Sequence, residues 1–176
     1  MAESPTLYLL LGLPGSGKTT AAKEISKITG AVHLSSDKFR LSLFEKPQFT
    51  QAEHDALYKM LDYMCELLLQ SGTSVVYDAN LNRLSHRQDK YNLAKKLFVK
   101  QELFWLKVLK ETAKKRRIAS QDTSLVPKHE SPTDMFDRIA GVFEAPLKTE
   151  TFTELDGTRI THDYMKKMLL LASNKS

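Results

Sequence analysis

The sequence predicts an α/β domain in which helices flank a five-stranded, mostly parallel β-sheet. Two observations lead to this prediction. Short runs rich in β-branched and aliphatic residues alternate along the chain with longer segments of helical periodicity, an arrangement typical of parallel sheets that helices cover on both faces. The length of 176 residues is that of about one domain and allows a sizeable core. We therefore expect residues 1–176 to form a single domain.

The individual elements follow from local patterns. "TQAE" (Thr50–Glu53) and "SHRQ" (Ser85–Gln88) fit capping boxes, and "SPTD" (Ser131–Asp134) places a serine cap before a proline. The turn "LDGT" (Leu155–Thr158) is compatible with a short antiparallel partner for the last strand. Helical patterns lie at about residues 18–29, 51–70, 85–98, 110–120, 132–143 and 161–173, with a short helix after the second strand. Five runs are expected to be strands: Leu7–Leu13, Val32–Ser35, Ser74–Asp78, Glu102–Leu109 and Thr151–Leu155.

Composition narrows the class of protein. The net charge of +5 suits an anionic ligand without requiring nucleic acid. The single cysteine, Cys65, excludes an internal disulfide, as is usual in a reducing cytosol. The first six residues lack the basic start of a secretory signal, and no apolar run reaches transmembrane length. These features predict a soluble, cytoplasmic protein without a membrane partner.

A glycine-rich segment follows the first expected strand. "GLPGSGKT", Gly12–Thr19, matches the phosphate-binding loop of nucleoside triphosphate-binding proteins, and a helical pattern follows it. Consecutive backbone N–H groups of such a loop point into one concavity at a helix N-terminus, which suits the α- and β-phosphates. Lys18 would contact the β- and γ-phosphates, and the Thr19 hydroxyl would ligate Mg²⁺. The sequence thus predicts ATP or another triphosphate, with Mg²⁺, bound by Gly12, Pro14, Gly15, Ser16, Gly17, Lys18, Thr19 and Thr20.

The segment "LSSDKFRLSLF" after the second expected strand carries a carboxylate and a guanidinium. The carboxyl ends of parallel strands meet in one crevice, so Asp37 and Arg40 should emerge beside the phosphate loop. Three residues apart on a short helix, they would be neighbours. Asp37 can accept the proton of an attacking hydroxyl, and Arg40 can hold a phosphate of the acceptor. The alternative interpretation is a helix cap and a surface ion pair.

A second polar segment, "TSVVYDANLNRLSHR", follows the third strand. Asp78 stands at the strand end, where P-loop enzymes keep an acid near the metal ion, so we expect it to support Mg²⁺ together with Thr19. A simple cap for the following helix is the alternative. The five histidines, His33 among them, are scattered singly and indicate no metal site. Phe39, Phe44 and Phe49 lie near the expected acceptor site, where they would either stack on a base or pack in the core.

"GLPGSGKT", "SSDKFR" and "VVYDANLN", in this order and spacing, resemble the 5′-hydroxyl polynucleotide kinase branch of the P-loop phosphotransferases, to which zeta-toxin-like kinases are related. "RIAGVFEAPLKTETFTEL", Arg138–Leu155, resembles the segment from the lid helix to the last strand. The resemblance implies a P-loop kinase fold with strand order 2-3-1-4-5 and a helical lid. It also implies that Asp37 is the general base, that Arg40 contacts the 3′-side phosphate of the acceptor, and that Asp78 supports the active site.

The lid, expected at about residues 110–143, departs from the family pattern. This branch carries two arginines about four residues apart that clamp the transferring phosphate. Here Arg116 and Arg117 are adjacent, and Ser120 stands four positions after Arg116. One of the two arginines is the expected clamp, and the second clamp is either missing or supplied from elsewhere. The loop Ser120–Ser131 is the natural hypothesis for a mobile flap.

Together these features predict an ATP- and Mg²⁺-dependent kinase that phosphorylates an acceptor hydroxyl, in the first place the 5′ end of a nucleic acid. Two alternatives stay open. One is a small-molecule kinase acting on a nucleotide sugar, a nucleoside or an antibiotic. The other is a nucleotide-binding switch without catalytic activity.

Overall fold

The computed structural model describes residues 4–120 and 123–174. The first six residues and the expected flap, Ser120–Ser131, are described only in part, because residues 1–3 and 121–122 lie outside this range. The strands are β1 (Thr6–Leu11), β2 (Val32–Ser35), β3 (Val75–Asp78), β4 (Lys100–Lys107) and β5 (Thr153–Asp156). The helices are α1 (Lys18–Thr29), α2 (Ser36–Leu43), α3 (Gln51–Gln70), α4 (Leu84–Leu97), α5 (Lys110–Ala119), α6 (Pro132–Gly141) and α7 (His162–Ser173).

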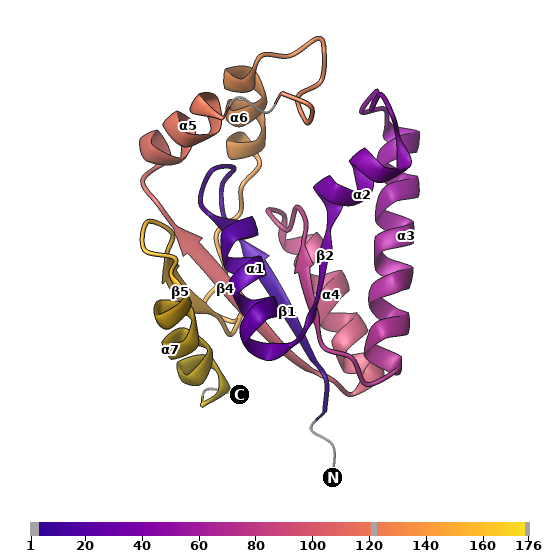
Figure 1. The fold of residues 1–176 in the computed structure, drawn as a ribbon, viewed down its shortest axis with the longest axis vertical. Coiled ribbons are helices and arrows are strands. Elements are labelled where there is room, and N and C mark those ends of the chain that lie inside the picture. Colours follow the sequence, from indigo (N-terminus) through magenta and orange to yellow (C-terminus); the bar gives the residue numbers. More distant parts are fainter. Residues whose placement is uncertain (1–3, 121–122, 175–176) are drawn as a thin grey trace.

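The five strands form one parallel sheet in the order β2-β3-β1-β4-β5, which confirms the predicted fold class and strand order. β1 lies at the centre, so its apolar side chains are buried on both faces. Leu7, Leu9 and Leu11 join the core beneath α3 and α4, and Leu10 joins the core beneath α1 and α7. In Figure 1, α5 and α6 lie beyond the ends of the strands, on the side of the loop that joins β1 to α1.

The prediction of a short antiparallel partner for the last strand is wrong. After β5 the Asp156 carboxylate accepts hydrogen bonds from the Thr158 backbone N–H at 2.9 Å and hydroxyl at 2.6 Å. This Asx turn redirects the chain toward α7, whose first turn is capped by the Thr161 hydroxyl. The turn residues therefore start a helix instead of a hairpin.

Two of the three predicted helix caps are confirmed. The hydroxyls of Thr50 and Ser131 accept hydrogen bonds from the backbone N–H groups of Glu53 and Asp134. The capping box at Ser85 is wrong, because α4 begins at Leu84, one residue earlier, without a side-chain cap.

Among the helices in the described part of the chain, not one is long and apolar enough to cross a bilayer.

Candidate active site

A cavity of about 940 Å³ opens at the carboxyl ends of the strands. Its walls come from the β1–α1 loop, α2, the segment after β3, α5 and α6. Gly12 and Ser16 of the predicted site are buried in the loop itself and do not line this cavity. All other predicted site residues do line it: Pro14, Gly15, Gly17, Lys18, Thr19, Thr20, Asp37, Arg40, Asp78, Arg116 and Arg117.

The phosphate-binding loop fits closely under α5. Gly15 has a φ of 80°, and a Cβ atom built there would lie 2.3 Å from the carbonyl oxygen of Ala113 in α5. Gly17, with a φ of 97°, occupies the N-cap position of α1. Side chains are therefore excluded from both positions, and the loop keeps its backbone exposed to the cavity.

Lys18 follows at the start of α1 and folds back over this loop. Its Nζ donates hydrogen bonds to the carbonyl oxygens of Gly12 and Leu13, at 2.7 and 2.9 Å. Burial lowers the pKa of Lys18 to about 8, although the carboxylates of Asp78 and Asp37 act in the opposite direction. A cation in this desolvated position gains much from the approach of a phosphate, because the surroundings screen the attraction poorly.

Asp37 lies in the first turn of α2, which the Ser35 hydroxyl caps. Burial in the cavity and the neighbouring Asp78 carboxylate raise the pKa of Asp37, while Lys18, Arg117 and Arg40 lower it. A carboxylate whose pKa is raised is a better proton acceptor than an ordinary aspartate, so the position suits a general base.

Arg40 follows one helical turn after Asp37 and is only 8% exposed. Its guanidinium lies over the ring of Phe49, 5.0 Å from the ring centroid. Its Nη1 is 3.6 Å from Glu53 Oε2, which is too far for a hydrogen bond, and has no hydrogen-bond partner among the described residues. Glu53 instead accepts hydrogen bonds from the backbone N–H groups of Gln48 and Phe49. Arg40 is thus a buried cation that forms an ion pair with Glu53, while its Nη1 is left without a hydrogen bond.

Asp78 ends β3 and is 6% exposed. Its Oδ2 lies 3.0 Å from Nε2 of His33 in β2. Sequence reasoning missed His33, because a single histidine in a strand shows no pattern. Its position near Asp78 could be inferred only from the pairing of β2 with β3. That pairing places His33 beside Val76, two residues before Asp78.

The two candidate clamp arginines differ in their surroundings. Arg116 donates a hydrogen bond from Nη1 to the carbonyl oxygen of Gly157, at 3.0 Å, and so connects α5 to the turn after β5. Arg117 lies close enough to Asp37 to influence its pKa. A third arginine, Arg138 of α6, also lines the cavity and forms a two-pronged pair with Glu130. The sequence pattern alone did not select Arg138.

Comparison with known proteins gives the family and the fold of the chain. A family model described as an AAA domain, AAA_33, matches residues 7–146. The chain belongs to the AAA_33 family. No curated protein is similar enough in sequence to match it.

Solved structures show the same fold as this AAA_33 chain. An APS kinase of Mycobacterium tuberculosis, in complex with AMPPNP and APS, has a TM-score of 0.69 and 18% identity, covering 97% of this chain and 98% of that one. A gluconokinase of Sinorhizobium meliloti has a TM-score of 0.67 and 16% identity, covering 98% and 97%. A chain of the Pnkp1/Rnl/Hen1 RNA repair complex has a TM-score of 0.65 and 22% identity, covering 81% of this chain and 45% of that one. The AAA_33 domain therefore has the P-loop kinase fold.

The cavity of this AAA_33 domain offers oxygen ligands of the kind that Mg²⁺ prefers. The described residues contain no cluster of three or more histidine, cysteine, aspartate or glutamate side chains that could hold a metal ion. Mg²⁺ bound with a nucleotide needs few protein ligands, because phosphate oxygens and water complete its coordination. The hydroxyl of Thr19 and the carboxylate of Asp78 both line the cavity beside Lys18, and this oxygen donor set fits the ion.

Proposed function

We propose that the protein is an ATP- and Mg²⁺-dependent kinase that transfers the γ-phosphoryl group to the 5′-hydroxyl end of a polynucleotide. The observation that carries this proposal is the buried Arg40 guanidinium, whose Nη1 lacks a hydrogen-bond partner in the described part of the chain and which lines the same cavity as Asp37. Guanidinium groups bind phosphate in a two-pronged fork. A nucleotide at a 5′-hydroxyl end carries a phosphate on its 3′ side, whereas a neutral sugar carries none.

The cavity residues divide into a donor side and an acceptor side. On the donor side, the loop N–H groups and Lys18 bind the triphosphate, and Arg117 stabilises the charge of the phosphoryl group in transit. Mg²⁺ held by Thr19 and Asp78 would neutralise phosphate charge when bound. On the acceptor side, Asp37 accepts the hydroxyl proton as the acceptor oxygen bonds to the γ-phosphorus and the bond to ADP breaks.

The acceptor side also offers aromatic surfaces. Phe49, His54 and Tyr58 line the cavity, and the rings of His54 and Tyr58 lie 4.3 Å apart between centroids. Such rings suit base stacking, as in proteins that bind single-stranded nucleic acid. Of the three phenylalanines considered from the sequence, Phe49 is the one that lines the cavity, whereas Phe39 packs against the core. These aromatic side chains support the proposal that the acceptor is a nucleotide.

A lid is part of the proposal. Residues 110–143 contain α5 and α6, and Lys114 of α5 pairs with Asp137 of α6 at 2.6 Å. Leu125 and Pro127, in the loop between these helices, line the cavity. We propose that the two helices cover the reacting groups as a unit and exclude water.

Arg40→Gln tests the acceptor assignment. The change should lower kcat/KM for a nucleoside 3′-monophosphate by about 10- to 100-fold, because a charged hydrogen bond to the phosphate is lost. The value for the corresponding nucleoside should change less than about threefold, since that acceptor has no phosphate to contact. Transfer from labelled ATP measures both. Lys38→Gln on the same helix is the matched control, since Lys38 is exposed and does not line the cavity. An equal loss with both acceptors would contradict the assignment.

A small-molecule kinase is the second candidate. The gluconokinase and the APS kinase align over nearly their whole length with this chain, whereas the chain of the RNA repair complex aligns over 45% of its own. A cavity of about 940 Å³ is also of the size that encloses small ligands. A kinase of this kind would phosphorylate a small acceptor in preference to an oligonucleotide.

A further inference from the structure

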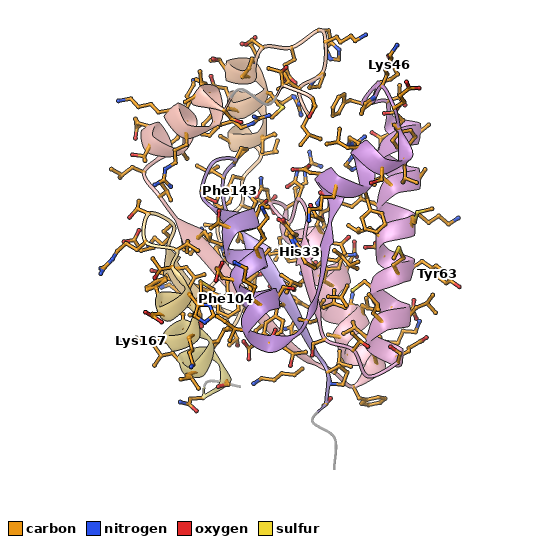
Figure 2. The ribbon with its side chains drawn as sticks, in the orientation of Figure 1. His33, Lys46, Tyr63, Phe104, Phe143 and Lys167 are labelled. Atoms are coloured by element: carbon orange, nitrogen blue, oxygen red, sulfur yellow. The ribbon has the colours of Figure 1, made fainter. Side chains whose placement is uncertain are left out.

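His33 has no place in the proposed reaction, yet it makes the most direct side-chain contact with the acid at the end of β3. Its Nε2 lies 3.0 Å from Asp78 Oδ2, and the two side chains are 10% and 7% exposed. Figure 2 shows His33 among the central side chains of the molecule, whereas Tyr63 and Lys167 point outward. A buried contact of this length is a hydrogen bond that both groups need, because neither is well solvated.

The contact is fixed by strand pairing. β2 and β3 run parallel, with Ser35 opposite Asp78 and His33 opposite Val76. The imidazole reaches Asp78 from the neighbouring strand. Rigid backbone on both sides therefore holds the two groups at this distance.

Asp78 also lies near a cation that would attract it. Its carboxylate is the largest of the charge effects that raise the pKa of Lys18 against the lowering effect of burial. Among the described residues, however, the two groups form no ion pair, and Lys18 Nζ donates to the carbonyl oxygens of Gly12 and Leu13. The arrangement leaves the Lys18 ammonium near Asp78 but not bound to it.

We propose that His33 is a positioning residue, which holds the Asp78 carboxylate away from Lys18 so that the ammonium stays available to the phosphates of the nucleotide. Without the imidazole, the buried carboxylate would turn to a cation of the same cavity, and Lys18 is one on which its charge already acts. A direct Asp78–Lys18 ion pair would compete with the triphosphate for the same cation. The inference rests on the nucleotide-binding part of the proposed function and not on the identity of the acceptor.

The test is the affinity for a fluorescent ATP analogue, measured without an acceptor, both in EDTA and with Mg²⁺. His33→Leu should raise the Kd about tenfold, because Asp78 then pairs with Lys18. His33→Gln keeps an N–H donor and should stay within about threefold of wild type. His33→Met is a second variant without a donor, so a folding defect of one variant does not remove the test. His162→Leu is the matched control, because His162 pairs with Glu24 on the surface.

A double-mutant cycle with Asp78→Asn separates positioning from simple packing. An amide does not attract Lys18 as a carboxylate does, so His33→Leu should have no further effect on the Kd in the Asp78→Asn background. The inference is overturned if His33→Leu and His33→Met both bind the analogue like wild type, or if the loss is equally large in the Asp78→Asn background. A protein that binds ATP with this pattern but phosphorylates no polynucleotide end would refute the proposed acceptor and leave the role of His33 standing.

Discussion

Asp37→Asn is expected to lower the kcat of phosphoryl transfer about 10²- to 10⁴-fold, the range typical of a lost general base. The amide has nearly the same shape but cannot accept the hydroxyl proton. The affinity for ATP should change little, because the loop and Lys18 bind the nucleotide. Transfer from γ-labelled ATP measures the rate, and fluorescence measures the affinity. Asp163→Asn, in the exposed first turn of α7, is the matched control and should leave both values unchanged.

The pH dependence of the wild-type enzyme is a second test of the role of Asp37. Burial and the Asp78 carboxylate raise the pKa of Asp37 above that of an ordinary aspartate, against the effects of Lys18, Arg117 and Arg40. Because the base acts only when ionised, kcat/KM should fall as the pH decreases through this raised pKa. Transfer that survives in Asp37→Asn at the wild-type rate would contradict the assignment, as would an acid limb centred at or below the ordinary aspartate value.

Arg87→Met is expected to lower the free energy of unfolding by about 3–5 kcal/mol, the usual cost of removing one partner of a buried ion pair. Arg87 is fully buried, and its Nε and Nη2 donate to the Glu150 carboxylate at 2.7 and 2.9 Å. Burial raises the pKa of Glu150, but hydrogen bonds from Arg87 and Tyr91 outweigh burial and bring it to about 2. The variant leaves that carboxylate buried without its guanidinium partner.

Urea unfolding followed by the fluorescence of Trp105 measures this loss. Arg138→Met is the matched control, because Arg138 forms a similar fork with Glu130 at the surface, where such pairs contribute at most about 1 kcal/mol. A second change, Glu150→Gln, should restore part of the stability of Arg87→Met. The depressed pKa of Glu150 stabilises the fold above the unfolded pKa of a glutamate, and this contribution should be lost as the pH falls toward 2. A loss below about 1 kcal/mol in Arg87→Met would contradict this account.

The same guanidinium also organises one wall of the candidate active site. Its Nη1 donates to the carbonyl oxygens of Leu81 and Glu144, at 3.0 and 3.1 Å. The Glu144 N–H in turn donates to the carbonyl oxygen of Asn82, which lines the cavity. Arg87 thus joins the segment after β3 to the segment before β5. Replacing this arginine should therefore disturb the wall of the cavity as well as the core.

The sequence was most informative where function depends on a local pattern. Gly15 and Lys18 were selected because a tight turn before a helix requires residues of these types at fixed spacing, and both line the cavity. Asp37 and Arg40 followed from the rule that parallel strands end in one crevice, and the cavity contains both.

Contacts between distant segments could not be predicted in this way. His33 meets Asp78 through the pairing of β2 with β3, and Arg138 reaches the cavity through the packing of α6 on α5. His33 stands in no recognisable motif, and Arg138 begins the segment that resembles the family but was not selected there as a site residue. The error at Ser85 has a local cause, since the N-cap of α4 is Arg83, two residues before the serine of the capping pattern. The differing surroundings of Arg116 and Arg117 likewise depend on the position of Gly157, far along the chain.

The most direct test of the proposed function is transfer from γ-labelled ATP to a panel of acceptors under identical conditions. The panel contains 5′-hydroxyl oligonucleotides of DNA and RNA, nucleosides, sugars and nucleotide sugars, with liberated phosphate measured in parallel. We predict label at the 5′ end of an oligonucleotide, with a rate that falls steeply as salt increases, because counterions are released when the strand binds. Label that appears only in a small acceptor, or only as inorganic phosphate, would contradict a polynucleotide 5′-hydroxyl kinase.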